Sequence, residues 1–354
     1  MPRCNHDEIA KGPPCDEYSH SRPLLAGRIC LAAFLIGRLT RHPQAGDGST
    51  RVSPLTGKSY DPIIQTDYSS ETALATQLAV RNISTIICTF IMDNEEVSDA
   101  QLRLIRTADR SNCVKRFIPS EFNVDYEVDD DHFPYPEKEY HVLAREALDK
   151  TTGLEYSFIY PGMFMDYFGM PKVQSALRPL ALFVDPEHDM ALIPGDGEAR
   201  MYISHTKDCA RYIALAMELE EWPDVMVTAT SSISPNGLVD LFERALGRKL
   251  KVTHQPIEKL MKHEGGILPT NEKLAEEYPD RFPGGLQQLR ELIDNLEAAV
   301  GLGAFDLTGV IGDAEDRLHV VDLVKQFDGK VPPPRRVGEL IKEAWGSDHK
   351  TTSK

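Results

Sequence analysis

Paired cysteines and long hydrophobic runs are both missing from this sequence of 354 residues. Its six cysteines are scattered without a Cys-x-x-Cys pair, which argues against a zinc site or a disulfide framework. The longest apolar stretch, Ile29 to Ile36, is far too short to cross a bilayer. The first 26 residues also lack the basic-then-apolar order of a signal peptide. We therefore expect a cytoplasmic protein that does not enter a membrane.

An excess of positive charge is missing as well. The chain carries 39 Lys and Arg residues against 55 Asp and Glu residues, a net charge of −16. Such a surface repels polyanions, so we expect no nucleic acid as a general partner. A small anionic cofactor is still compatible with this charge, because helix N-termini and one or two arginines are enough to hold it.

Several well-known catalytic motifs are absent. The sequence has no Gly-x-Ser-x-Gly elbow, no Gly-x-x-x-x-Gly-Lys phosphate loop and no His-Glu-x-x-His helix. The run Asp129-Asp130-Asp131 resembles a metal site only in composition, since three consecutive side chains do not converge on one ion. We predict an exposed acidic loop there and no metal.

The pattern that is present alternates strands with helices. Charge-free β-rich runs such as Ile83 to Phe90 are typical of strands buried on both faces. Segments with helical spacing separate them, as in Ser70 to Val80, where Ser69 or Ser70 would cap the helix. This order predicts an α/β fold with a Rossmann-like, doubly wound parallel sheet. Predicted strands are 63–66, 83–90, 114–119, 156–160 and 225–228, and predicted helices are 70–80, 96–110, 137–150, 204–220 and 234–246.

Three segments resemble one known family. Val114 to Phe122 reads VKRFIPSEF, Gly153 to Tyr167 reads GLEYSFIYPGMFMDY, and Ile193 to Gly197 reads IPGDG before a helix from Ser204 to Trp222. Together, in this order, they are similar to the isoflavone reductase-like family, a branch of the atypical short-chain dehydrogenases that includes the NmrA-like proteins. The resemblance extends from about residue 35 to the end and is nearest to the fungal NmrA-like branch.

The resemblance implies a division into domains. Residues 1–26 would be a disordered segment, and residues 27–170 with 200–232 a Rossmann-like NAD(P)-binding domain. Residues 171–199 with 233–354 would form a smaller, mostly helical substrate-binding domain. The run Gly195-Asp196-Gly197 marks a tight turn, which we place in a hairpin.

The resemblance also implies how NADP would be bound. Arg41, after the second strand, would meet the 2′-phosphate through two charge-assisted bonds, although an ordinary exposed arginine is the alternative. Asp67 would lie beside the adenine, or simply cap a strand end. Thr89 and Phe90 would lie over the cofactor at the carboxyl end of their strand, unless Phe90 is core packing.

The loop after the next strand would lie near the nicotinamide. It contains Ser120 and Glu121, and Glu121 would alternatively cap a helix or pair with a nearby base. Pro161 closes a further strand of the same crevice. Met163, Phe164 and Tyr167 follow that turn and are predicted to line the substrate side, although an aromatic stripe is more often core.

The catalytic position departs from the family pattern. Plant members carry a lysine that acts as general acid or base, and counting back from Tyr156 places that position on His141. Lys138, one turn earlier, is the second candidate, and Arg145 lies on the same face. A histidine that titrates near neutrality can transfer a proton. A helix with this mixture of charges is also what a plain solvated face looks like.

The glycine loop of the family is the largest departure. Members begin with a strand and a Gly-x-x-Gly-x-x-Gly turn that brings backbone N–H groups to the pyrophosphate. Before Arg41 only Gly12, Gly27 and Gly37 occur, without that spacing. We interpret Ile29 to Ile36 as a remnant of the first helix, with the first strand and glycine loop lost or replaced. Either the start of the sequence is mis-assembled, or tight dinucleotide binding has been lost.

The expected function is therefore an NADPH-dependent oxidoreductase that reduces a small, aromatic or secondary-metabolite substrate. The alternative is a non-enzymatic, NmrA-like redox sensor that binds NAD(P) and a protein partner. A fold remnant without any cofactor is the third hypothesis.

Overall fold

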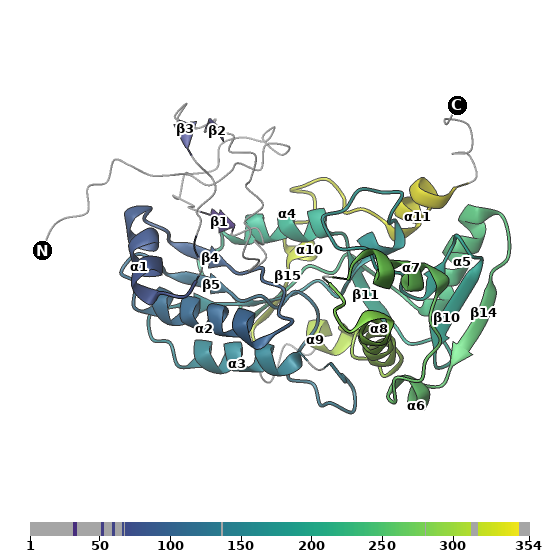
Figure 1. Ribbon diagram of the computed structural model, residues 1–354. Coiled ribbons are helices and arrows are strands. Elements are labelled where there is room, and N and C mark those ends of the chain that lie inside the picture. Colours follow the sequence, from purple (N-terminus) through teal and green to yellow (C-terminus); the bar gives the residue numbers. More distant parts are fainter. Residues whose placement is uncertain are drawn as a thin grey trace, which may run out of the picture. The chain divides into compact units, whose positions relative to one another are not determined.

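The computed structural model describes residues 31–33, 51–52, 59–60, 66, 68–135, 137–279, 281–312 and 318–346 (Figure 1). These residues divide into two compact units. The first unit comprises Met1–Glu121, Glu137–Phe158 and Met217–Asp224, and the second comprises Phe122–Pro136, Ile159–Ala216 and Val225–Lys354. The domain boundaries predicted above differ from this division and stay a prediction.

A parallel sheet forms the centre of the first unit. It contains β1 (Leu31–Ala33), β4 (Thr85–Ile87), β5 (Arg116–Ile118) and β6 (Glu155–Tyr156) in the order β1-β4-β5-β6. All three residues of β4 are buried, as expected for a strand covered on both faces. Between β1 and β4 in the sequence, β2 (Arg51–Val52) and β3 (Ser59–Tyr60) form an antiparallel pair.

The place of β1 corrects one interpretation of the sequence. Leu31–Ala33 pairs in parallel with β4, with Leu31 opposite Thr85. In a doubly wound sheet with strand order 3-2-1-4-5-6, the neighbour of the fourth strand is the first strand. The segment Ile29 to Ile36 therefore supplies a strand in the first-strand position, and the interpretation of it as a helix remnant is wrong. The three glycines named above lie outside the described residues.

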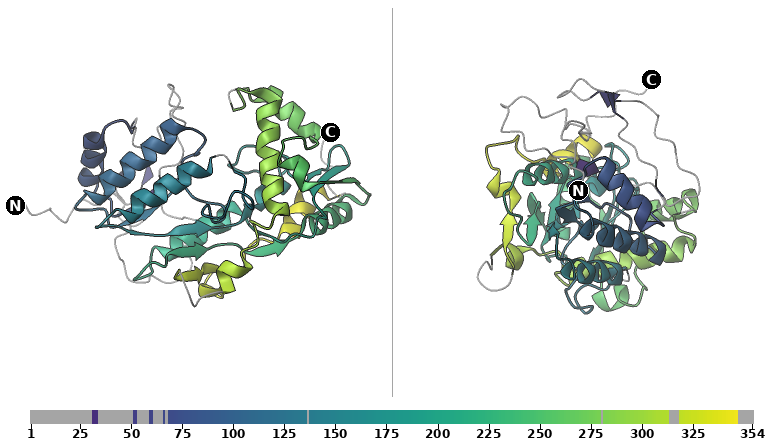
Figure 2. Two further views of the ribbon diagram at one scale, coloured as in Figure 1. Left: turned by 90° about the horizontal axis from the view of Figure 1, so that it is seen from below. Right: turned by 90° about the vertical axis from the view of Figure 1, so that its left-hand side faces the viewer.

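Three helices pack side by side in the first unit: α1 (Glu71–Val80), α2 (Glu95–Asp109) and α3 (Lys138–Asp149) (Figure 2). The helix α1 begins where predicted, because the Ser70 hydroxyl accepts a hydrogen bond from the Ala73 N–H at 3.2 Å. At the start of α2 the Asn94 side chain does the same for the Val97 N–H at 3.0 Å. These caps confirm the predicted helix positions to within a residue or two.

The second unit contains several small sheets. Strands β15 (Val320–Asp322), β12 (Val225–Val227) and β7 (Phe158–Tyr160) form one sheet in that order. Another has the order β14 (Lys251–Gln255), β10 (Met190–Pro194), β9 (Val184–Asp185). The last has the order β13 (Ser231–Ile233), β11 (Met201–Ser204), β8 (Met163–Phe164).

The predicted turn at Gly195 to Gly197 is present, but the hairpin is not. Gly195 and Gly197 have φ values of 58° and 78°, and the Gly197 N–H donates to the Pro194 carbonyl at 3.1 Å. The strands on either side, β10 and β11, belong to different sheets. The turn therefore redirects the chain from one sheet to another, which local sequence does not distinguish from a hairpin.

Helices dominate the described residues after position 233, as predicted. The helix α5 ends at Gly247, whose φ of 67° suits a left-handed cap. The helices of the second unit are α4 (Thr206–Ala216), α5 (Pro235–Leu246), α6 (Ile257–Leu260), α7 (Pro269–Glu277), α8 (Gly285–Gly301), α9 (Thr308–Gly312), α10 (Leu323–Gln326) and α11 (Val337–Trp345), with a 3₁₀ turn η1 (Met165–Phe168).

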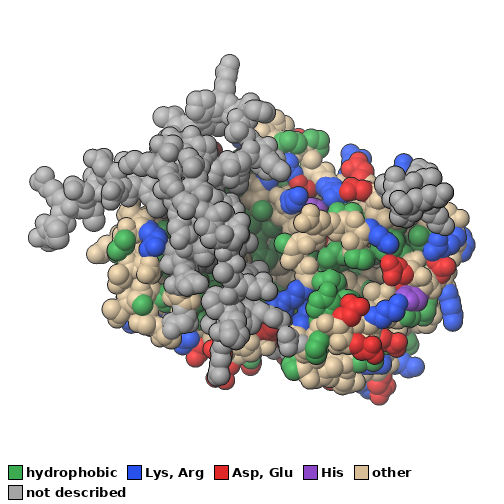
Figure 3. All heavy atoms as spheres, turned by 45° about the horizontal axis from the view of Figure 1, so that its top comes forward, with side chains coloured by type: hydrophobic (Ala, Val, Ile, Leu, Met, Phe, Trp, Pro, Cys, Tyr) green, Lys and Arg blue, Asp and Glu red, His purple; other side chains and the backbone are tan. Residues whose placement is uncertain are grey.

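Charged and hydrophobic side chains are mixed on the face of the molecule that Figure 3 draws. On the face drawn in Figure 3, acidic and basic side chains lie among one another and do not separate into patches of one sign. Asp129 to Asp131 are exposed, as predicted for this run. In the part of the chain that the structure describes, no helix has the length and apolar character needed to span a bilayer.

Candidate functional site

The carboxyl ends of β4 and β5 in the first unit are the predicted location of the cofactor. Thr85 to Cys88 are buried, whereas Thr89 and Phe90 are half-buried, so the chain reaches an accessible edge of the sheet where the crevice is expected. Two further predicted cofactor residues, Arg41 and Asp67, lie outside the described residues. The location of Thr89 and Phe90 agrees with the prediction, while their role stays a prediction.

Ser120 fixes the two strand ends to each other. Its hydroxyl donates to the Phe90 carbonyl at 2.6 Å, and its N–H donates to Gln101 Oε1 at 2.7 Å. The Phe90 ring lies edge-on against Tyr68, with 5.0 Å between the ring centroids. The loop that follows β5 is thereby held against the loop that follows β4, and a ligand at this edge would meet a rigid wall.

Glu121 forms a buried ion pair with Arg145 of α3. The contact is bidentate along one edge of the guanidinium, because Arg145 Nε donates to Glu121 Oε2 at 3.0 Å and Nη2 donates to Oε1. The side chains are only 1% and 6% exposed, respectively. The Arg145 guanidinium also lies 4.4 Å from the centroid of the Phe158 ring. Of the roles that the sequence left open for Glu121, pairing with a nearby base is confirmed.

His141 lies on the same buried face of α3 as Arg145. It is 6% exposed, so the interpretation of this face as plainly solvated is wrong for both residues. Burial, and next the charge of Arg145, lower the pKa of His141 to about 3 against the opposing effect of a hydrogen bond to the Ser120 backbone. The imidazole is therefore neutral at pH 7, and the expectation that it titrates near neutrality does not hold. Lys138 is half-buried one turn earlier.

The predicted substrate wall lies in the second unit. Gly162 makes the sharp turn into it with a φ of 66°, and its N–H donates to the Asn123 carbonyl at 3.0 Å. Met163 is 4% exposed, and Pro161 before the turn is also buried. Phe164 and Tyr167 are half-buried and offer part of their rings to a ligand. The two aromatic residues thus fit a pocket wall better than Met163 does.

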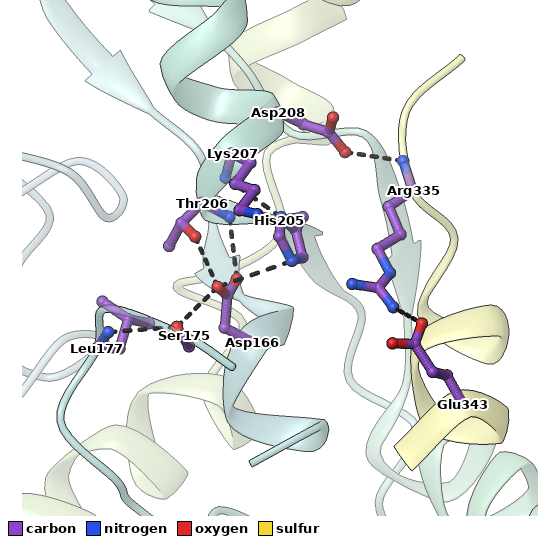
Figure 4. Close-up of polar contacts among 9 residues, drawn as sticks. All are labelled: Asp166, Ser175, Leu177, His205, Thr206, Lys207, Asp208, Arg335 and Glu343. Carbon is purple, nitrogen blue, oxygen red and sulfur yellow. Dashed lines mark hydrogen bonds and ion pairs between the residues drawn. The ribbon is translucent and has the colours of Figure 1, made fainter. Parts of the chain in front are cut away.

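Asp166, between these aromatic residues, anchors the start of α4 (Figure 4). Its carboxylate accepts hydrogen bonds from the Thr206 N–H at 2.9 Å, the Thr206 hydroxyl at 2.6 Å and the Ser175 hydroxyl at 2.9 Å. His205 Nε2 lies 3.8 Å from the same carboxylate, yet burial lowers the pKa of His205. A carboxylate at a helix N-terminus is favourable. The sequence analysis missed this network, whose members come from three separate segments.

The donor set at the strand ends suits an organic cofactor and offers little to a metal ion. Thr89 and Phe90 are half-buried, and a hydroxyl and an aromatic ring are groups that a nicotinamide nucleotide can contact. Among the described residues, no cluster of three or more His, Cys, Asp or Glu side chains is arranged to hold a metal ion. The residues present therefore fit a dinucleotide in the crevice.

Comparisons with known proteins agree with this fold. The model of the NmrA-like family matches residues 57–299. The oxidoreductase swnN of Metarhizium robertsii is 26% identical over 306 residues, covering 78% of this chain and 83% of that protein. The isoflavone reductase homolog IRL of Zea mays is 28% identical over 204 residues, covering 56% of this chain and 62% of that protein.

Solved structures confirm the predicted fold class. The binary complex of leucoanthocyanidin reductase with NADPH from Vitis vinifera superimposes with a TM-score of 0.56. It is 16% identical and covers 78% of this chain and 80% of that chain. At this identity the likeness establishes a Rossmann-like α/β architecture.

Proposed function

This chain belongs to the NmrA-like family, and from that premise we propose that it is an NADPH-dependent reductase of the isoflavone reductase type. Its substrate is a small aromatic molecule or secondary metabolite. The observation that carries the proposal is the rigid, half-buried wall at the carboxyl ends of β4 and β5, where Ser120 joins the two loops. The oxidoreductase names of the relatives from fungi and the isoflavone reductase name of the maize relative support it.

The cofactor is assigned to this wall. Thr89, Phe90 and Ser120 would hold the nicotinamide half. Pro161 stays a predicted cofactor residue of the second unit. Arg41 would hold the 2′-phosphate, where its planar guanidinium favours NADP over NAD. When bound, NADPH supplies a hydride. The protein would then orient the two reactants, exclude water and transfer the proton that accompanies the hydride.

His141 is the first candidate for the residue that transfers this proton. In the free protein it is neutral, because burial and Arg145 lower its pKa to about 3. A neutral imidazole stabilises developing negative charge by donating a hydrogen bond, and a nearby anion raises its pKa toward the range in which it can exchange a proton. Lys138, half-buried on the preceding turn, is the second candidate for the same role.

A direct test combines cofactor binding with turnover. The protein is titrated with NADPH and NADH, and NADPH consumption is then followed against a panel of aromatic ketones, enones and ethers. We expect preferential NADPH binding, and we expect His141→Ala to lower kcat by about 10²-fold or more while NADPH affinity stays unchanged. The control is His254→Ala, an exposed histidine on β14. Failure to bind NADPH would refute the proposal.

A redox sensor is the second candidate function, and the low pKa of His141 favours it. The plant lysine is replaced by a residue that is uncharged at pH 7, which weakens acid catalysis without affecting binding. Such a protein would bind a partner protein with an affinity that changes with the NADP/NADPH ratio. Loss of turnover in His141→Ala on an identified substrate would exclude this reading. Unchanged turnover together with ratio-dependent partner binding would favour it.

A further inference from the structure

Two arginines of the second unit lie close together, and neither has an acidic partner among the described residues. Arg178 precedes Pro179, and Arg281 Nη1 donates to the Pro179 carbonyl at 2.6 Å, so the Arg281 guanidinium reaches the backbone next to Arg178. Both are half-buried. Within the described part of the chain, neither guanidinium meets a carboxylate, although the chain carries 55 acidic residues. Two neighbouring like charges out of bulk water are unfavourable unless an anion joins them.

The third member of the cluster is Tyr167. Three charged groups act on the pKa of its hydroxyl: Arg281 and Arg178 lower it, and Asp166 raises it. Burial raises the pKa of Tyr167, so its hydroxyl keeps its proton and can donate it in a hydrogen bond. Burial lowers the pKa of Arg281 to about 10, and the like charge of Arg178 contributes to this shift. Arg281 nevertheless remains charged at pH 7.

The segment that carries Arg178 is held in place on both sides. Ser175 donates to Asp166 at 2.9 Å (Figure 4). Farther on, the Ala181 N–H donates to Asn271 Oδ1 at 3.0 Å, and Asn271 Nδ2 donates to the Ala181 carbonyl at 2.8 Å. Asn271 is itself fully buried in α7. A segment fixed at these points positions its arginine before a ligand arrives, which lowers the entropic cost of binding.

We propose that Arg178 and Arg281, with the Tyr167 hydroxyl, bind an oxyanion group of the substrate. The two guanidinium groups supply planar pairs of N–H donors that match a carboxylate or a phosphate. This inference rests on the proposed function only in taking the ligand to be the substrate. It restricts the substrate class to small aromatic molecules that carry an acidic group, and neutral phenols would bind less well.

Binding of simple probes tests the inference without turnover. Isothermal titration with benzoate, phenyl phosphate and benzamide compares two anions with a neutral molecule of similar shape. We expect at least one anion to bind about tenfold or more tightly than benzamide, because charge-assisted hydrogen bonds replace neutral ones. Preference for benzoate or for phenyl phosphate identifies the acidic group. Equal affinities, or no binding of either anion, would overturn the inference.

Variants assign the effect to the cluster. Arg178→Gln and Arg281→Gln are each expected to weaken binding of the preferred anion about tenfold or more and to leave benzamide unaffected. Arg244→Gln, an exposed arginine of α5 in the same unit, is the matched control, and thermal melting checks that all variants are folded. Wild-type anion affinity in both cluster variants would refute the assignment.

A cofactor titration separates the two sources of an oxyanion. If Arg178 and Arg281 serve the substrate, NADPH affinity of both variants stays within about twofold of the wild type. A loss of NADPH affinity parallel to the loss of benzoate affinity would mean that the arginines hold a cofactor phosphate, and would overturn the inference. Because benzoate binding is measured without NADPH, a failure of the proposed reductase function would leave this result interpretable.

Discussion

Glu121 and Arg145 provide the sharpest test of the forces that hold the candidate site together. The pair is bidentate, its side chains are 1% and 6% exposed, and the arginine also covers the Phe158 ring. Replacing one partner removes the bidentate contact from the other buried charge, which costs about 3–5 kcal/mol. We therefore expect Glu121→Leu to lower the free energy of unfolding of the first unit by about that amount.

The double variant behaves differently. Glu121→Leu combined with Arg145→Met removes both charges and replaces them with apolar side chains of similar length, and the methionine sulfur can still contact Phe158. Exchanges of this kind are often neutral or stabilising. The double-mutant cycle should consequently give a coupling energy of about 2–4 kcal/mol, far above the value for exposed pairs.

Urea denaturation followed by tryptophan fluorescence measures these differences. The sequence has two tryptophans, so a Trp345→Phe background leaves Trp222 as the single reporter. Trp222 is 7% exposed and belongs to the first unit, as do Glu121 and Arg145. The denaturation midpoint and slope then report this unit.

An exposed carboxylate with two arginine partners is the matched control. Glu71 contacts Arg106 at 2.9 Å and Arg110 at 2.8 Å, but its side chain is 33% exposed. We expect Glu71→Leu to cost only about 0.2–1 kcal/mol. If Glu121→Leu is no more harmful than this control, or if the double variant is as unstable as the sum of the singles, the buried-pair argument is wrong.

Two further predictions concern the second unit. Gly162→Ala should strongly destabilise the folded protein, because the residue has a φ of 66° and the added Cβ would clash with the Tyr202 carbonyl. Gly247 has a similar φ of 67° but open space around it, so Gly247→Ala should cost only about 1 kcal/mol. Thermal melting compares the two, and equal losses would contradict the clash. Burial raises the pKa of Glu297 well above its ordinary value, so the folded state binds a proton that the unfolded state releases. The free energy of unfolding therefore falls as pH rises from the ordinary carboxyl range to the raised pKa, by up to ~1.4 kcal/mol per pH unit. Glu297→Gln removes this fall, so its advantage over the wild type should grow between pH 5 and pH 8. Parallel stability curves for variant and wild type would refute the shift, and Glu276→Gln, at an exposed position of α7, is the control.

The sequence predicted the elements whose signals are local. Ser70 and Gly247 are recognisable as helix boundaries because each satisfies backbone groups within its own turn. Similarly, the absence of charged residues around β4 was enough to predict that this strand is buried. The hairpin at Gly195 and the helix at Ile29 to Ile36 were wrong because strand pairing depends on partners far along the chain. Residues opposite Leu31, for example, are more than fifty positions away.

The candidate site shows the same limit in its chemistry. Spacing placed His141 and Arg145 on one face of α3, but alternating charges suggested a solvated face. The apolar residues Ala144 and Leu148 on that face are the signal for burial that the charges obscured. Arg178 and Arg281 lie about a hundred positions apart, and no periodicity connects them. Their proximity follows only from the fold.

The charge balance around Arg145 gives a physical reason for a histidine at position 141. The positive charge of Arg145 is matched by Glu121, so this buried group is neutral as long as position 141 is neutral. A lysine at 141 would add a second cation beside Arg145, and burial and repulsion would lower its pKa. In the role proposed for it, the neutral His141 would exchange a proton once a ligand brings negative charge beside it and raises its pKa.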